Sequence, residues 1–269
     1  KNQSLNNLTL SAMAFALKRA GDEMFNYTKN AVLFTAQLEK TMAVTGSVAG
    51  ATKEEVGQLT DAMLEMGTNV PVKFQKISDS MYNMASAGLN TQEVLASMPQ
   101  AMKLAVGVGE DLDKTTELLI STVKSFDMSF EDSPKILDIF ANSVAKSMAT
   151  VEKLQVSFAR VAPVAKNAGV SFEETTAILS KLYDLGLKGS NAGTVLGNVM
   201  TRLTTFTDQS TKALKRAGLS TKDVSLEYNT MGESLAKITL AMKNNKLGAE
   251  QLQYIFGTRG KIITDFLGQ

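Results

Sequence analysis

The sequence predicts an all-α protein, in which about a dozen short helices form a compact multi-helix bundle preceded by a longer N-terminal helix. Three observations predict this class. Apolar residues recur at helical spacing along the chain, helix start and stop signals are dense, and segments with a strand preference are short. The composition agrees, because 14 Met and only 4 Pro among 269 residues favour packed helices.

Residues 1–45 are expected to form the long N-terminal helix or arm. Apolar residues between Leu8 and Leu38 are mostly spaced as on one face of a helix, and Gly21 is its weak point. Residues 45–50 (TGSVAG) are small and polar, so we expect a flexible connection there. The domain that follows is therefore placed at residues 46–269.

The first helix of this domain is marked by a capping box. Thr52 can accept a hydrogen bond from the amide of Glu55, whose carboxylate can reach back to the amide of Thr52. We expect the helix to run to about Met66 and to end at Gly67. The β-leaning segment 70–72 that follows is too short to indicate a sheet.

Three later helix-helix corners share one local pattern of Ala-Gly, an apolar residue, a polar N-cap residue and a nearby acid. In each corner the glycine can adopt the left-handed conformation that ends one helix, while Asn or Ser caps the next. The residues are Gly88 and Asn90, Gly169 and Ser171, and Gly218 and Ser220. Duplication and convergent capping chemistry explain the likeness of the first two corners equally well.

Further helix starts are predicted from the same rules. They lie at residues 109–111, at Ser133 with Pro134 in the first turn, at Thr150 and at Asn191. Residues 224–228 (VSLEY) are the second short β-leaning segment. A candidate sub-boundary of the domain lies near residue 206.

Composition excludes several classes of function. The chain has no Cys and no His, so it offers no disulfides, no thiolate or Ser-His-Asp nucleophile and none of the usual zinc or haem ligand sets. No apolar run is long enough to span a bilayer. A net charge of +1 argues against specific nucleic-acid binding. We expect no catalytic residue, no cofactor and no metal.

The charge is unevenly distributed along the chain. Residues 1–135 carry a net charge of −4 and residues 136–269 a net charge of +5. This asymmetry is compatible with head-to-tail stacking, with a mildly basic interaction face, or with a solvated surface alone.

A cluster of small residues on one expected helix is the strongest candidate for a functional contact. Gly193 and Gly197 form a Gly-x-x-x-Gly pattern that would let another backbone approach closely. That backbone can belong to the same chain or to another protomer, and both interpretations stand. The candidate residues are Gly189, Ala192, Gly193, Thr194 and Gly197.

The other glycine, serine and acidic motifs lack the companion residues or strands that their usual functions require. Residues 186–194 lack the lysine and the preceding strand of a phosphate loop, and residues 257–260 lack the flanking strands of a KH loop. The two Ser-x-x-Lys motifs have none of their companion motifs. The acidic residues 110–113 lack the glutamate that an EF-hand requires.

Four segments in this order resemble the N-terminal helical domain of the tape measure proteins of long-tailed bacteriophages. They are residues 87–93 (AGLNTQE), 99–106 (PQAMKLAV), 162–174 (APVAKNAGVSFEE) and 185–194 (LGLKGSNAGT), and the likeness extends over residues 34–267. Prophage remnants and tailocins carry similar proteins, so the resemblance covers them as well.

The resemblance implies a structural domain that acts in tail assembly and tail-length determination. It implies a virion component that lies in the tail tube lumen before DNA ejection, and in the host cytoplasm during assembly. Implied partners are tail tube, tail tip or tail assembly chaperone proteins, together with other copies in a trimer or another ring. The alternative from the residues alone is a free-standing helical adaptor or scaffold that binds partner helices.

Overall fold

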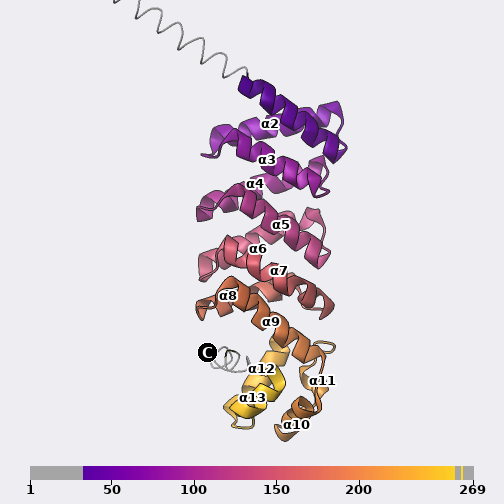
Figure 1. Cartoon of the computed structure of the whole chain (residues 1–269), viewed down its shortest axis with the longest axis vertical. Coiled ribbons are helices and arrows are strands. Elements are labelled where there is room, and N and C mark those ends of the chain that lie inside the picture. The colour runs from indigo at the N-terminus through magenta and orange to yellow at the C-terminus, as the bar shows by residue number, and fades with distance from the viewer. Residues whose placement is uncertain (1–32, 258–261, 263–269) are drawn as a thin grey trace, which may run out of the picture. The chain divides into compact units, whose positions relative to one another are not determined.

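The computed structural model describes residues 33–257 and residue 262 (Figure 1). Every regular element among them is a helix, so the predicted all-α class is confirmed. The chain divides into two units, Lys1–Thr91 and Gln92–Gln269. The boundaries expected at residues 45–46 and near residue 206 stay predictions, and the expected N-terminal helix lies outside the described residues up to residue 32.

The first unit contains a helix over residues 33–49, then α2 (Lys53–Asn69) and α3 (Phe74–Ser86). The capping box opens α2. The amide of Thr52 donates to Glu55 Oε2 over 2.7 Å, and the amide of Glu55 donates to Thr52 Oγ1 over 3.3 Å. Within this unit α2 and α3 pack against each other.

The expected flexible connection at residues 45–50 is wrong, because the first described helix continues to residue 49. Gly46 lies inside that helix where a Cβ would collide with the side chain of Val56 on α2. The glycine therefore serves close helix packing here. The left-handed residue that follows the helix is Gly50, with φ +68°.

The expected end of α2 at Gly67 is also wrong by two residues. Gly67 lies inside the helix, and the ring of Phe74 occupies the space that a Cβ at this position would need. The helix ends before Pro71, since a residue that precedes proline avoids the helical region. Val70 is accordingly extended, with φ −132° and ψ 144°.

The second unit contains the remaining elements. In chain order they are α4 (Thr91–Val108), α5 (Leu112–Phe126), the 3₁₀ helix η1 (Phe130–Asp132), α6 (Ser133–Lys146), α7 (Val151–Asn167), α8 (Phe172–Asp184), α9 (Gly189–Thr204), α10 (Asp208–Arg216), α11 (Thr221–Val224), α12 (Met231–Lys243) and α13 (Ala249–Phe256).

Helices α5 to α9 of this unit stack as antiparallel hairpins in two layers. The odd-numbered helices α5, α7 and α9 pack side by side, and α6 packs against α8 in the other layer. Short corners join the layers, and Figure 1 shows these helices following one another in chain order. Among the helices that follow, α10 packs against α13 and α11 against α12, while α13 also packs against α9 of the stack.

Four phenylalanines form the centre of the stack. Phe126, Phe140, Phe158 and Phe172 come from four successive helices, α5 to α8. In five of the six pairs among them the ring centroids lie 5.2–5.9 Å apart, and three of these pairs meet edge to face. Such pairs add to the stabilisation that burial of the rings provides.

The β-leaning segment 224–228 does not form a strand. Val224 ends α11, and a turn follows in which the amide of Leu226 donates to the carbonyl of Leu203 over 3.1 Å. Val224 and Leu226 are both buried, so their alternation with polar residues reflects a turn packed onto α9.

Candidate functional site

The seam between α7 and α9 contains the small residues that the sequence singles out. Helix α9 begins at Gly189 with Lys188 as its N-cap, three residues before Asn191, which was expected to cap this helix. A Cβ placed on Gly189 would lie 2.8 Å from the carbonyl oxygen of Lys153, and one on Gly193 would lie 2.6 Å from that of Ser157. Both contacts are with α7 backbone, so the close approach uses the glycines at 189 and 193.

Gly197 lies on the same helix but in a different environment. A Cβ there would be 3.8 Å from Val164 Cγ2, an ordinary van der Waals distance. Ala192 is fully buried, and Thr194 is half-buried with its hydroxyl donating to the carbonyl of Ser190 over 2.7 Å. Val164 also lies on α7, so Gly197 faces the same helix, but the pair closest to the α7 backbone is Gly189 and Gly193, one turn earlier than the Gly193–Gly197 pattern.

A buried polar network lies at the same seam, and sequence patterns did not reveal it. Ser157 Oγ donates to the carbonyl oxygen of Gly189 over 2.6 Å, and Tyr183 OH on α8 donates to Ser157 Oγ over 2.7 Å. Tyr183 OH also lies 3.1 Å from the carbonyl of Lys153. Burial raises the pKa of Tyr183 well above its ordinary value. The network joins α7, α8 and α9 where the backbones are closest.

The three corners share left-handed glycines. Gly88, Gly169 and Gly218 have φ values of +105°, +71° and +78°. After each glycine the next amide donates to a carbonyl five residues earlier, as in a Schellman motif. The residue that follows the glycine is apolar in each corner. Leu89 and Val170 are buried, and Leu219 is half-buried.

The polar residues of the corners differ in their hydrogen bonds. Ser171 accepts from the amide of Glu174 over 3.1 Å and caps α8. Ser220 donates through its amide to Asp223 Oδ2 over 2.7 Å. Asn90 is exposed and directly precedes α4. These residues lie where one helix ends and the next begins, between α3 and α4, between α7 and α8, and between α10 and α11.

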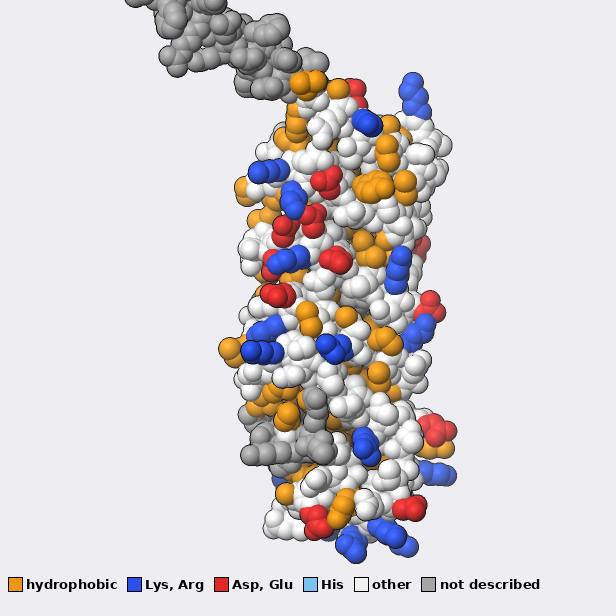
Figure 2. All heavy atoms as spheres, in the orientation of Figure 1, with side chains coloured by type: hydrophobic (Ala, Val, Ile, Leu, Met, Phe, Trp, Pro, Cys, Tyr) orange, Lys and Arg blue, Asp and Glu red, His pale blue; other side chains and the backbone are white. Residues whose placement is uncertain are grey.

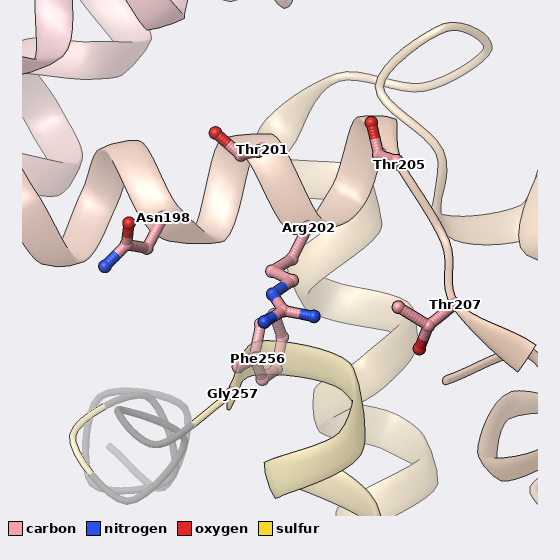
Figure 3. Close-up of a pocket in the computed structure, with 7 residues that line it drawn as sticks. All are labelled: Asn198, Thr201, Arg202, Thr205, Thr207, Phe256 and Gly257. Carbon is pink, nitrogen blue, oxygen red and sulfur yellow. The ribbon is translucent and has the colours of Figure 1, made fainter. Parts of the chain in front are cut away.

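A polar pocket of about 400 Å³ lies at the end of α9, and the sequence did not indicate it (Figure 3). Asn198, Thr201 and Arg202 project from α9, while Gly257 follows the end of α13. Gly257 has φ +74°, and a Cβ there would lie 3.4 Å from Arg202 Nη2. The close approach lets the guanidinium lie against the end of α13.

The carboxylates of three helix caps have pKa values below their ordinary range. The amide of Thr52 lowers the pKa of Glu55, that of Ser220 lowers the pKa of Asp223, and that of Thr230 lowers the pKa of Glu233. Hydrogen bonds to the charged form cause each shift, because they favour the ionised carboxylate.

These lowered pKa values predict loss of stability in acid. A carboxylate whose pKa is lower in the folded state stabilises the fold above its unfolded pKa, and this contribution disappears as the pH falls through the folded pKa. We therefore expect the free energy of unfolding to be level above about pH 6 and to fall below about pH 4.5. Urea denaturation monitored by circular dichroism at pH 7, 4 and 3 measures the free energy of unfolding at each pH.

Glu233→Gln provides the control for the acid effect. The amide side chain can still accept a hydrogen bond from Thr230 but does not titrate, so the fall in stability below pH 4.5 is expected to become shallower. An unchanged slope would show that the cap carboxylate of Glu233 does not contribute to the acid sensitivity.

Within the described ranges, no helix is long and apolar enough to cross a membrane. The same part of the chain holds no group of three or more acidic side chains that could bind a metal ion. Figure 2 shows Lys and Arg side chains interspersed with Asp and Glu on the face drawn. The features that the structure brings together are helix caps, corners and close helix contacts, which define a helical scaffold.

The chain belongs to the phage-related minor tail protein family, whose family model matches residues 60–257. Within it, the chain is 29% identical over 87% of its length to the tape measure protein of Pneumococcus phage Dp-1. It is 28% identical over 78% of its length to the probable tape measure protein of Escherichia phage P2.

A third relative is the probable tape measure protein of Clostridium phage phiCD119, which is 25% identical over 70% of the chain. The chain spans only 19%, 27% and 22% of the lengths of these three relatives. No solved structure matches the chain.

Proposed function

We propose that this chain is a structural, non-enzymatic domain of a phage tail tape measure protein, and that it acts in tail assembly and tail-length determination. The observation that carries the proposal is the similarity to three tape measure proteins over 70–87% of the chain. The helical scaffold supports it, because the described residues form stacked helices joined by capped corners.

The domain cannot set the length of a tail by itself. An α-helix rises about 1.5 Å per residue, so even a single helix of this length would reach only about 400 Å. Folding into stacked hairpins shortens that reach further. Because the chain spans about a fifth to a quarter of its relatives, its contribution is that of one folded part of a longer protein.

We infer that the domain lies in the tail tube lumen of the virion before DNA ejection and in the host cytoplasm during assembly. Its partners would be tail tube, tail tip or tail assembly chaperone proteins. Other copies of the chain would join it in a trimer or another ring. A free-standing helical adaptor is the weaker alternative, because the relatives of this chain are named as tape measure proteins.

An in-frame deletion of residues 92–257 in the full-length protein, expressed during phage growth, tests the proposal. Electron microscopy is expected to show loss of normal tails, because the deletion removes the second folded unit. The matched control is Tyr228→Ala, which changes an exposed side chain on the same unit and is expected to leave tails normal. Tails of normal number and length in the deletion would contradict the proposal.

A further inference from the structure

The core of residues 33–91 is built from aliphatic and methionine side chains. The three aromatic residues of this range, Phe34, Phe74 and Tyr82, are exposed or only half-buried. Methionine is flexible and fills irregular space, so a methionine-rich core specifies one packing less strongly. The fully buried methionines of the range are Met42, Met63, Met81 and Met84.

The same range also leaves much of its apolar surface exposed. Among the described residues, six of the eleven exposed large apolar side chains lie here, although residues 92–257 make up a much longer part of the chain. Apolar surface that stays in water adds nothing to the hydrophobic stabilisation of the fold. The six are Leu33, Phe34, Val44, Val48, Leu64 and Tyr82.

The second unit has contacts that fix its helices to one another more firmly. Phe140, Phe158 and Phe172 are buried, and their rings meet at its centre. Ser157 on α7 bonds to the carbonyl oxygen of Gly189 on α9 and to Tyr183 on α8. Buried aromatic pairs and a buried hydrogen-bond network therefore hold this unit together in addition to aliphatic packing.

Hydroxyl groups in residues 33–91 bond within single helices instead. Thr41, Thr45, Thr60 and Ser78 each donate to a carbonyl oxygen three or four residues earlier in their own helix. Such bonds do not join two helices. These four groups therefore leave the contact between helices to side-chain packing, in which the buried methionines take part.

We propose that residues 33–91 open as a separate unit of low stability, while residues 92–257 keep their fold. Proteins open in cooperative units whose free energies of opening differ widely, and units with few buried apolar contacts open most easily. Opening exposes the methionine side chains of α2 and α3 and leaves the phenylalanine cluster intact. The chain thus combines a segment that can rearrange with a stack that keeps its structure. This inference goes beyond the proposed function and does not depend on it.

Hydrogen-deuterium exchange of the purified 1–269 chain, measured by mass spectrometry, reports the opening of each unit. Protection factors are compared between peptides from α2 and α3 and peptides from α7 and α9. The α2 and α3 peptides are expected to have protection factors at least about tenfold lower, because they exchange through opening of the first unit alone.

Two methionine substitutions form a matched pair for this measurement. Met63 on α2 and Met200 on α9 are both fully buried, and each lies in a different unit. Met63→Ala leaves a cavity in the first unit, so it is expected to lower the protection of α2 and α3 at least about tenfold and to leave α7 and α9 unchanged. Met200→Ala is expected to have the reverse effect, with α7 and α9 less protected and α2 and α3 unchanged.

Complete unfolding of the first unit by Met63→Ala would support the proposal as long as α7 and α9 keep their protection. Three results would overturn it. They are protection of α2 and α3 in the unsubstituted chain that equals or exceeds that of α7 and α9, loss of protection in both units with Met63→Ala, and loss of protection in both units with Met200→Ala. The first would show that residues 33–91 are not the weaker unit, and the other two that the units open together.

Discussion

Gly193→Ala is expected to lower the free energy of unfolding by about 2–3 kcal/mol, through overpacking against the backbone of α7. The new Cβ would lie 2.6 Å from the carbonyl oxygen and 2.9 Å from the Cα of Ser157. Backbone atoms cannot move aside by a rotamer change, so α7 and α9 must separate. That separation would also weaken the buried bonds of Ser157 to Gly189 and Tyr183.

Gly197→Ala is the matched control on the same helix. Its Cβ would meet only Val164 Cγ2 at 3.8 Å, and alanine favours a helix over glycine by up to about 1 kcal/mol. We expect unchanged or increased stability. Thermal unfolding separates the two variants, with a fall in Tm of roughly 4–12 °C for Gly193→Ala. Unchanged melting of Gly193→Ala together with lost assembly would show that position 193 is a protomer contact instead.

Phe140→Ala is expected to have the largest effect on stability, a loss of about 3–5 kcal/mol. Its ring is fully buried, and its centroid lies 5.6 Å from that of Phe158 and 5.2 Å from that of Phe172. Removing it leaves a cavity where α6, α7 and α8 meet, and the neighbouring rings are fixed by their own helices. Urea unfolding of the 1–269 chain measures the loss.

Tyr228→Ala is the control for this aromatic deletion. Tyr228 is 58% exposed on the same unit, so little burial is lost and the expected change is within about 1 kcal/mol. Equal effects of the two substitutions would contradict the role of the phenylalanine cluster as the centre of the stack.

The helix class and many helix ends could be predicted because they depend on local chemistry. The capping box of Thr52 and Glu55 is visible in four consecutive residues, and the hydrogen bonds are short-range. The left-handed residues Asp127 and Asn245, each with φ 58°, escaped prediction because they are not glycine. The structure shows that helices end at these positions too, because the amide of the next residue, Met128 or Lys246, donates to a carbonyl five residues earlier.

The roles of individual glycines could not be predicted from spacing alone. The sequence pattern predicts that the chain leaves the helical conformation at Gly46 and Gly67. Both residues are helical, and each lies against a side chain of the neighbouring element. On α9, spacing indicates Gly193 with Gly197, whereas the closest contacts with α7 are at Gly189 and Gly193. In the sequence, a glycine that ends a helix cannot be distinguished from one that allows another helix or side chain to pack closely. The distinction requires the position of the neighbouring element.

The order of the layers depends on contacts between distant segments. Periodicity assigns an apolar face to α5, α7 and α9 but does not say that these helices pack in one layer. The bond from Tyr183 to Ser157 joins residues 26 positions apart, so no local pattern reveals it. The pocket beside Arg202 likewise requires α13 to return to the end of α9.

The most direct test of the central claim is mass spectrometry of purified, intact phage particles. If the chain is a structural domain of the tail, peptides from residues 60–257 are expected in particles with tails and in isolated tails. Their presence in infected-cell lysate but absence from purified tails would contradict the claim.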